Sequence, residues 1–302
     1  MKKIICIGEC SLNIVLDAGG TPLGAMPGGR IVNAAAILAR EHIPTLMATD
    51  TAADSVGDIV VSFLTDAGVD ISSLDRFTDG RTPLNVFSTA ADGTFAITRY
   101  EKYPDECFDI VWPRIDEGDI VIFGGYYAID RRMRERLYKL LSHAAERKAV
   151  LIYLPGFMQA QESRITRVMP AILENLEIAH MVITGNSDLS TIFGIGSAEK
   201  CYRDHIDFYC RSLIDIDTGC HRISYFGGKE AVSVDIPSSA AGTMMWNAGA
   251  VAGVAAAVFK NGITPADLDA PCPDIRREIL SSAALCAGAT AASLTEQWQT
   301  FR

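Results

Sequence analysis

A run of small residues in segment 242–260, GTMMWNAGAVAGVAAAVFK, forms the first candidate site. Asn247, Ala248, Gly249 and Ala250 stand where a strand or loop is expected to give way to a helix rich in Ala and Val. The first N–H groups of a helix have no partner within it and lie at the positive end of its dipole. Small side chains leave these groups open to an anion such as phosphate. The same residues also fit a buried helix that packs closely against its neighbours, and both explanations stay open.

Glycines and amides near the amino terminus form a second group of candidates. Gly28 and Gly29 precede a helical segment that contains Asn33, and Asn13 follows the first apolar strand. Amide side chains donate and accept hydrogen bonds, so they can hold hydroxyl groups. The alternative is structural: the glycines make the turn into the helix, and Asn33 caps or packs.

Apolar strands alternate with helical segments along the chain, and glycines follow many of the strands. Strands are predicted at 3–8, 45–48, 119–123, 149–153, 181–184 and 222–226, and helices at 33–40, 56–67, 133–147 and 165–176. This order predicts an α/β fold, a parallel sheet with helices on both faces. Ligands of such sheets bind at the carboxyl ends of the strands, where the glycine-bearing loops lie.

Two segments, about 11–27 and 81–103, show a different pattern. Their residues alternate and include turn signals such as Asp92-Gly93, so they are predicted to form strands that project from the core. Arg99 and Lys102 lie in the second segment and are expected mainly on a solvated face. The chain is therefore predicted to be one α/β domain, residues 1–302, with these two segments as a small β-lid.

The composition excludes several classes of function. The 302 residues carry a net charge of −10 and no basic block, which argues against a nucleic-acid surface. No apolar run reaches the length of a membrane span, so no membrane association is predicted and a cytoplasmic protein is expected. The eight cysteines form no CxxC pair, and the five histidines show no metal-binding spacing.

Several of these motifs together resemble the ribokinase/PfkB family of sugar kinases. Gly28-Gly29-x-x-x-Asn33-x-Ala35 resembles the family's first signature, and segments 54–57 and 67–70 resemble the parts that follow it. The segment 242–260 falls where the family carries a Gly-Ala-Gly-Asp loop that opens a core helix. The resemblance covers nearly the whole chain and implies a ribokinase-like fold.

The resemblance also implies an activity and the residues that carry it. Family members transfer the γ-phosphate of ATP, commonly with magnesium, to a sugar hydroxyl. The Asp of the loop takes the hydroxyl proton, and the loop's N–H groups form an anion hole. Here the implied anion hole is Asn247, Ala248, Gly249 and Ala250. The implied sugar site is Asn13, Gly28, Gly29 and Asn33, and the implied nucleotide site is Asn186, Ser224 and Gly227.

The chain departs from the family pattern at positions that matter for catalysis. Ala250 stands at the position of the general base, and a methyl group cannot accept a proton. Asn13 replaces an Asp, and Leu154 replaces the first residue of an Asp-Pro-Asn motif. Leu189 replaces the Glu of an Asn-x-x-Glu motif associated with magnesium, and Asp188 substitutes for it if the register slips by one residue.

Three functions therefore remain open. The first is an ATP-dependent carbohydrate kinase that acts without the usual Asp. The second is a pseudokinase that binds a sugar, a nucleotide or a protein partner. The third is a purely structural subunit. We also hypothesise a homodimer through the lid strands, since their free edges expose unpaired backbone groups.

Overall fold

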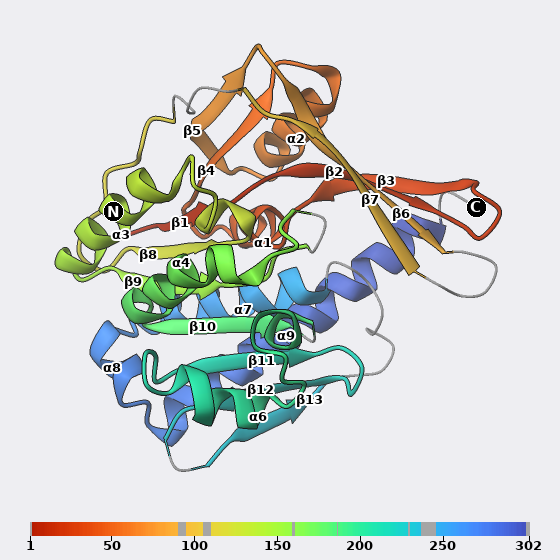
Figure 1. Ribbon diagram of the computed structural model, residues 1–302. Helices are drawn as coiled ribbons and strands as arrows, with labels where there is room; N and C mark the ends of the chain where they lie inside the picture. Colours follow the sequence, from red (N-terminus) through yellow and green to blue (C-terminus); the bar gives the residue numbers. More distant parts are fainter. Residues whose placement is uncertain are drawn as a thin grey trace.

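The computed structural model describes residues 2–89, 95–104, 110–158, 161–185, 187–228, 230–236 and 246–299. Within them a nine-stranded sheet forms the centre of the molecule (Figure 1). Its order is β13 (Val232–Asp235), β12 (Arg222–Phe226), β11 (Leu213–Asp217), β10 (Met181–Gly185), β9 (Val150–Leu154), β8 (Ile120–Gly124), β1 (Ile4–Ile7), β4 (Thr45–Ala52) and β5 (Asp70–Phe77). Neighbouring strands from β11 to β5 are parallel, whereas β12 is antiparallel to both its neighbours.

The central strands are buried on both faces, which explains their continuous apolar runs. In β1, Ile4 and Cys6 point into one apolar cluster, and Ile5 and Ile7 point into another on the opposite face. The first cluster receives side chains from α1 (Arg30–Arg40), α2 (Ser55–Asp66), α7 (Trp246–Lys260), α8 (Pro265–Asp269) and α9 (Pro273–Gln299). The second receives them from α3 (Arg134–Glu146), α4 (Ile165–Ile178), α5 (Asp188–Phe193), α6 (Ala198–Cys201) and the short turns η1 (Tyr126–Ala128) and η2 (Tyr202–Ile206). The prediction of helices on both faces of a mostly parallel sheet is confirmed.

A second, four-stranded sheet has the order β3 (Pro22–Gly28), β2 (Ser11–Leu16), β6 (Arg81–Thr89) and β7 (Phe95–Lys102). Figure 1 shows it extending away from the carboxyl end of β1. Strands β2 and β6 are parallel, and the outer pairs are antiparallel. The strands occupy the two segments with alternating residues. The proposed Asp92-Gly93 turn lies outside the described residues.

Helix α7 lies in the apolar core against α9. Its side chains from Ala248 to Val258 are buried, and Trp246 is 0% exposed. A Cβ on Gly253 would clash with the backbone of Ser282 in α9, so this glycine allows the two helices to approach closely. Close packing therefore explains part of the small-residue pattern.

Among the described residues, every helix is too short or too polar to span a membrane.

Candidate active site

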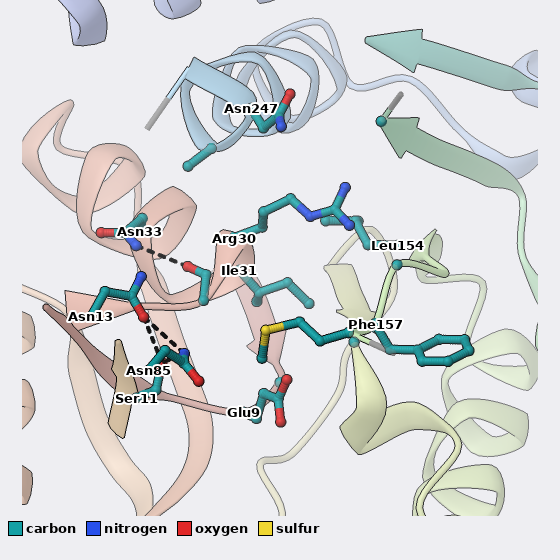
Figure 2. Close-up of a pocket in the computed structure, with 18 of the residues that line it drawn as sticks. Glu9, Ser11, Asn13, Arg30, Ile31, Asn33, Asn85, Leu154, Phe157 and Asn247 are labelled. Atoms are coloured by element: carbon teal, nitrogen blue, oxygen red, sulfur yellow. Dashed lines mark hydrogen bonds between the residues drawn. The ribbon is translucent and has the colours of Figure 1, made fainter. Parts of the chain in front are cut away.

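A cavity of about 410 Å³ lies at the carboxyl ends of the central strands. The residues that end or directly follow five adjacent parallel strands line it: Gly8, Gly124, Leu154, Gly185 and Thr218. Side chains of the four-stranded sheet form another wall, and the start of α7 closes one end (Figure 2). The position is the one expected for ligands of a parallel α/β sheet.

Four polar side chains form a hydrogen-bonded cluster at one end of the cavity. Asn85 Nδ2 donates to Ser11 Oγ (3.0 Å) and to Asn13 Oδ1 (2.8 Å). Arg99 Nη1 donates to Asn85 Oδ1 at 3.1 Å. Since a guanidinium only donates, Arg99 fixes the orientation of the Asn85 amide, which in turn fixes that of Asn13. We call Ser11, Asn13, Asn85 and Arg99 the polyol end.

The result of this chain of hydrogen bonds is a donor that faces the cavity. With its oxygen turned to Asn85, Asn13 directs its nitrogen to the other side, as Figure 2 shows. Asn13 is 5% exposed, and no described residue accepts a hydrogen bond from this nitrogen. A ligand at this end therefore meets an amide donor where the resemblance leads one to expect a carboxylate.

Glycine is required beside this cluster. A Cβ on Gly28 would clash with Ser11 Oγ and Asn13 Oδ1. Asn33 Nδ2 donates to the carbonyls of Pro27 (3.0 Å) and Gly29 (2.9 Å), so the side chain holds the turn into α1. The hydrogen bonds of Asn33 Nδ2 therefore support the structural role predicted for this residue. Asn33 and Gly29 also line the cavity.

Glu9 lies beneath the polyol end and is bound on two sides. Its carboxylate accepts from Arg99 Nη2 at 3.2 Å and from Gln161 Nε2 at 2.7 and 3.0 Å. Burial raises the pKa of Glu9 in spite of Arg99, which lowers it.

The Arg99 side chain is only 4% exposed, so the expectation that it lies on a solvated face is wrong. Lys102 is exposed, as expected, and pairs with Asp79.

The other end of the cavity is formed by the start of α7. Of the four residues proposed as the anion hole, Asn247 and Ala248 line the cavity. Gly249 faces α9, where a Cβ would come within 3.0 Å of Ala287 Cα. Ala250 is fully buried among apolar side chains and is not part of the cavity wall. The residues of this segment that line the cavity are therefore Asn247 and Ala248, of which Ala248 is 1% exposed, and neither is an acid.

An ion pair crosses the cavity beside this helix start. Arg30 Nη1 donates to Asp188 Oδ2 at 2.7 Å, and Nη2 donates to Oδ1 at 2.9 Å. The backbone N–H of Gly185 also donates to Asp188 Oδ2 at 2.8 Å. A Cβ on Gly156 would clash with both members of the pair, so a glycine is required at this position. We call Arg30, Asp188, Asn247 and Ala248 the phosphate end.

Comparison with known proteins agrees with this architecture. The family model described as pfkB family carbohydrate kinase matches residues 1–203. This chain belongs to the pfkB family. The fold also resembles the fructokinase of Vibrio cholerae O395 in its apo form, with a TM-score of 0.78, 17% identity, and 98% of this chain and 99% of that chain covered.

Two further similar structures are of a kinase that is named for a different substrate. The aminoimidazole riboside kinase of Salmonella enterica matches with a TM-score of 0.77, 16% identity and 99% of both chains covered. Its complex with aminoimidazole riboside and an ATP analogue matches with a TM-score of 0.76 and 15% identity, again over 99% of both chains. At these identities the likeness concerns the fold alone. No curated protein matches the sequence significantly.

Magnesium, which family resemblance implies, does not fit the described residues of this pfkB-family cavity. Asp188 is the candidate ligand, but both its carboxylate oxygens are bound to Arg30 and one also to Gly185. Leu189 is packed in the apolar core. No group of three His, Cys, Asp or Glu suited to a metal occurs in the described ranges. Asn186 lies outside them.

The remaining nucleotide candidates lie away from the cavity. Ser224 on β12 shares a hydrogen bond of 2.9 Å with Ser233 on β13. Gly227 packs beside Tyr225 and Pro271, and its carbonyl accepts from Arg276 Nη1 at 2.9 Å. Neither is among the residues that line the cavity, and their role in nucleotide binding stays a prediction. Sequence reasoning missed Thr218, Asn85 and Gln161, because only the fold brings them to this place.

Proposed function

We propose that this chain binds a sugar-class polyol in the cavity and is a pseudokinase, unable to transfer the γ-phosphate of ATP efficiently. One observation carries this proposal: the cavity-facing residues at the start of α7 are Asn247 and Ala248, which cannot take a proton from a hydroxyl. Asp188, the carboxylate at this end, is held by Arg30.

The polyol end supports the binding half of the proposal. About 410 Å³ is enough room for a small ligand. The cluster is built before any ligand arrives, because strands β2, β6 and β7 place its side chains and Arg99 orients them. A pre-organised site loses little entropy when a ligand binds. The four-stranded sheet would cover the ligand from one side as a lid.

The phosphate end supports the catalytic half. The other carboxylate among the described residues of the wall, Glu9, lies beneath the polyol end and accepts from Arg99 and Gln161. Loss of a general base lowers the rate by a factor on the order of 10²–10⁴. A slow kinase is the second candidate, and family membership favours it.

The deciding experiment measures binding and turnover separately. Calorimetry with a panel of sugars tests the binding half, and a coupled assay of ADP release with ATP, Mg²⁺ and each sugar tests turnover. We expect binding of at least one sugar and little ADP release. Efficient turnover by the unaltered chain would refute the pseudokinase, and failure to bind any sugar would refute the polyol site.

Restoring a carboxylate sharpens the test. Ala248→Asp places an acid on the cavity wall, and we expect ADP release with the bound sugar to rise by roughly 10²-fold or more. Ala250→Asp is the matched control, because its carboxylate would lie in the core and could not reach a ligand. A faster Ala250→Asp enzyme would show that the helix starts in a different register from the one described.

We propose in addition that the chain forms a homodimer through the four-stranded sheet. Tyr100 on edge strand β7 is 60% exposed, and Leu23 on edge strand β3 is 49% exposed. Pairing of two copies would cover these side chains and the unpaired edges. Sedimentation at micromolar concentration should give the mass of a dimer, and a monomer there would remove this proposal.

A further inference from the structure

The phosphate end has an unusual composition: a fixed guanidinium lies where the family resemblance leads one to expect room for a metal. Arg30 begins α1, and its side chain reaches across the cavity towards the ends of β9 and β10 (Figure 2). A Cβ on Gly185 would lie 3.3 Å from Arg30 Nη1 and 3.7 Å from Asn247 Nδ2. Two donor groups from α1 and α7 therefore converge at the end of β10.

The ion pair fixes Arg30 without using all its donors. A guanidinium has five N–H groups, and the two-pronged contact with Asp188 takes two of them. No other described residue accepts a hydrogen bond from Arg30. Its side chain is 26% exposed and lines the cavity, whereas Asp188 is 6% exposed. Both side chains line the cavity, and the guanidinium is the more exposed of the two to a ligand.

The start of α7 adds to the same electrostatic field. Asn247 and Ala248 belong to the first turn of a 15-residue helix, whose unpaired N–H groups and dipole favour an anion. Arg30 is independent of this helix and adds the remaining N–H donors of a guanidinium, whose charge Asp188 balances in the absence of a ligand. Guanidinium and phosphate match in shape and charge.

We propose that Arg30, held by Asp188, is the phosphate-binding cation of this cavity and acts without a divalent metal. The site takes the phosphate group of a nucleotide or of a phosphorylated sugar. The inference goes beyond the proposed function, because it concerns a phosphate site that is separate from the polyol end and is tested without a sugar substrate.

Calorimetry on the whole chain tests the metal first. ATP and ribose 5-phosphate, each in EDTA and then with excess Mg²⁺, serve as probes of the two sources of phosphate. We expect at least one to bind in EDTA, with an affinity that Mg²⁺ raises by less than about threefold. Binding of ATP alone identifies the nucleotide, and binding of ribose 5-phosphate alone identifies the phosphorylated sugar. Binding of either probe only with Mg²⁺, or of neither under any condition, would overturn the proposal.

Four variants then assign the role of the ion pair. Arg30→Gln should weaken binding of the probe by roughly 10- to 100-fold, the range for a hydrogen-bonded charge. Asp188→Asn leaves the cation in place, so binding should be retained or strengthened, whereas a metal-ligand role for Asp188 predicts its loss. The double variant Arg30→Gln/Asp188→Asn leaves no unpaired charge, and it should bind the probe as weakly as Arg30→Gln does. Arg222→Gln breaks an exposed pair with Asp235 and is the matched control.

Folding is checked independently of binding. The thermal unfolding of each variant is measured. That of Arg30→Lys is measured as well, since this variant keeps the positive charge but cannot make the second hydrogen bond to Asp188. If Arg30→Gln fails to fold, the double variant decides the matter, because it removes both charges together. Unchanged probe affinity in a folded double variant would overturn the proposal.

Discussion

The two ends of the cavity differ in how their side chains are placed. The polyol end lies on neighbouring strands of the four-stranded sheet, where Arg99 donates a hydrogen bond to Asn85 and Asn85 donates to Asn13 and Ser11. The phosphate end lies at the starts of α1, α5 and α7, where a single ion pair joins two of these helices.

Because of this difference, we expect a substitution at one end to leave the other end intact. The polyol end depends on strand pairing and stays intact when a residue at a helix start changes. The phosphate end depends on individual side chains, so one substitution there alters the chemistry without altering the fold. The chain retains the first end as a built site, while the second carries a cation but no free base.

The largest expected effect distinguishes the cavity face of α7 from its core face. Ala250→Asp would bury a carboxylate among apolar side chains and should lower the free energy of unfolding by about 3–5 kcal/mol. Ala248→Asp borders the cavity, where water and Arg30 are near, so the loss should be much smaller. Urea denaturation of both variants measures the difference, and equal losses would contradict the placement of Ala248.

A buried carboxyl group, that of Asp50, should give the next largest effect. Asp50 on β4 is 1% exposed, neither of its oxygens has a hydrogen-bond partner among the described residues, and burial raises its pKa to about 8. The folded state therefore holds this proton more tightly than the unfolded state, whose Asp pKa is about 3.9. The stabilisation is complete below about pH 4 and is lost as the pH rises towards 8.

Asp50→Asn removes this dependence on pH. The variant should match the unaltered chain in stability near pH 4 and exceed it by a few kcal/mol, as an order of magnitude, at pH 9. Urea denaturation at both pH values provides the measurement. Because Asp50 lies outside the cavity wall, binding of the phosphate probe should not change. A variant that is less stable than the unaltered chain at pH 9 would show that Asp50 is paired in solution.

The smallest effect, a selective loss of affinity, tests directly whether the ends are separable. Gly28→Ala places a methyl group against Ser11 and Asn13, and Gly156→Ala places one against Arg30 and Asp188. We expect the first to weaken sugar binding about tenfold and leave the phosphate probe unaffected, and the second to do the reverse. Calorimetry with each ligand on each variant gives the four values. Equal losses for both ligands would mean that the two ends act as one site.

Much of the fold was predictable because the strongest patterns come from the most buried elements. The strands and helices next to β1 were predicted close to their observed bounds, since full burial demands continuous apolar runs. Strands β5, β11 and β13 were missed. In β5 exposed and buried residues are mixed, and β11 carries Asp215, whose carboxylate accepts from Thr184 at 2.9 Å. Such partners become visible only when the neighbouring strand is known.

The sequence by itself determined the α/β architecture, the family and the absence of an acid in segment 247–250, because periodicity and residue type are local properties. The tertiary structure decided which of these residues borders the cavity: Ala248 lines it, and Ala250 packs in the core. It also brought Arg30 to Asp188, 158 residues later in the chain. No local pattern contains that contact, because it arises only when the start of α1, after a strand of the four-stranded sheet, meets the end of β10 in the nine-stranded sheet.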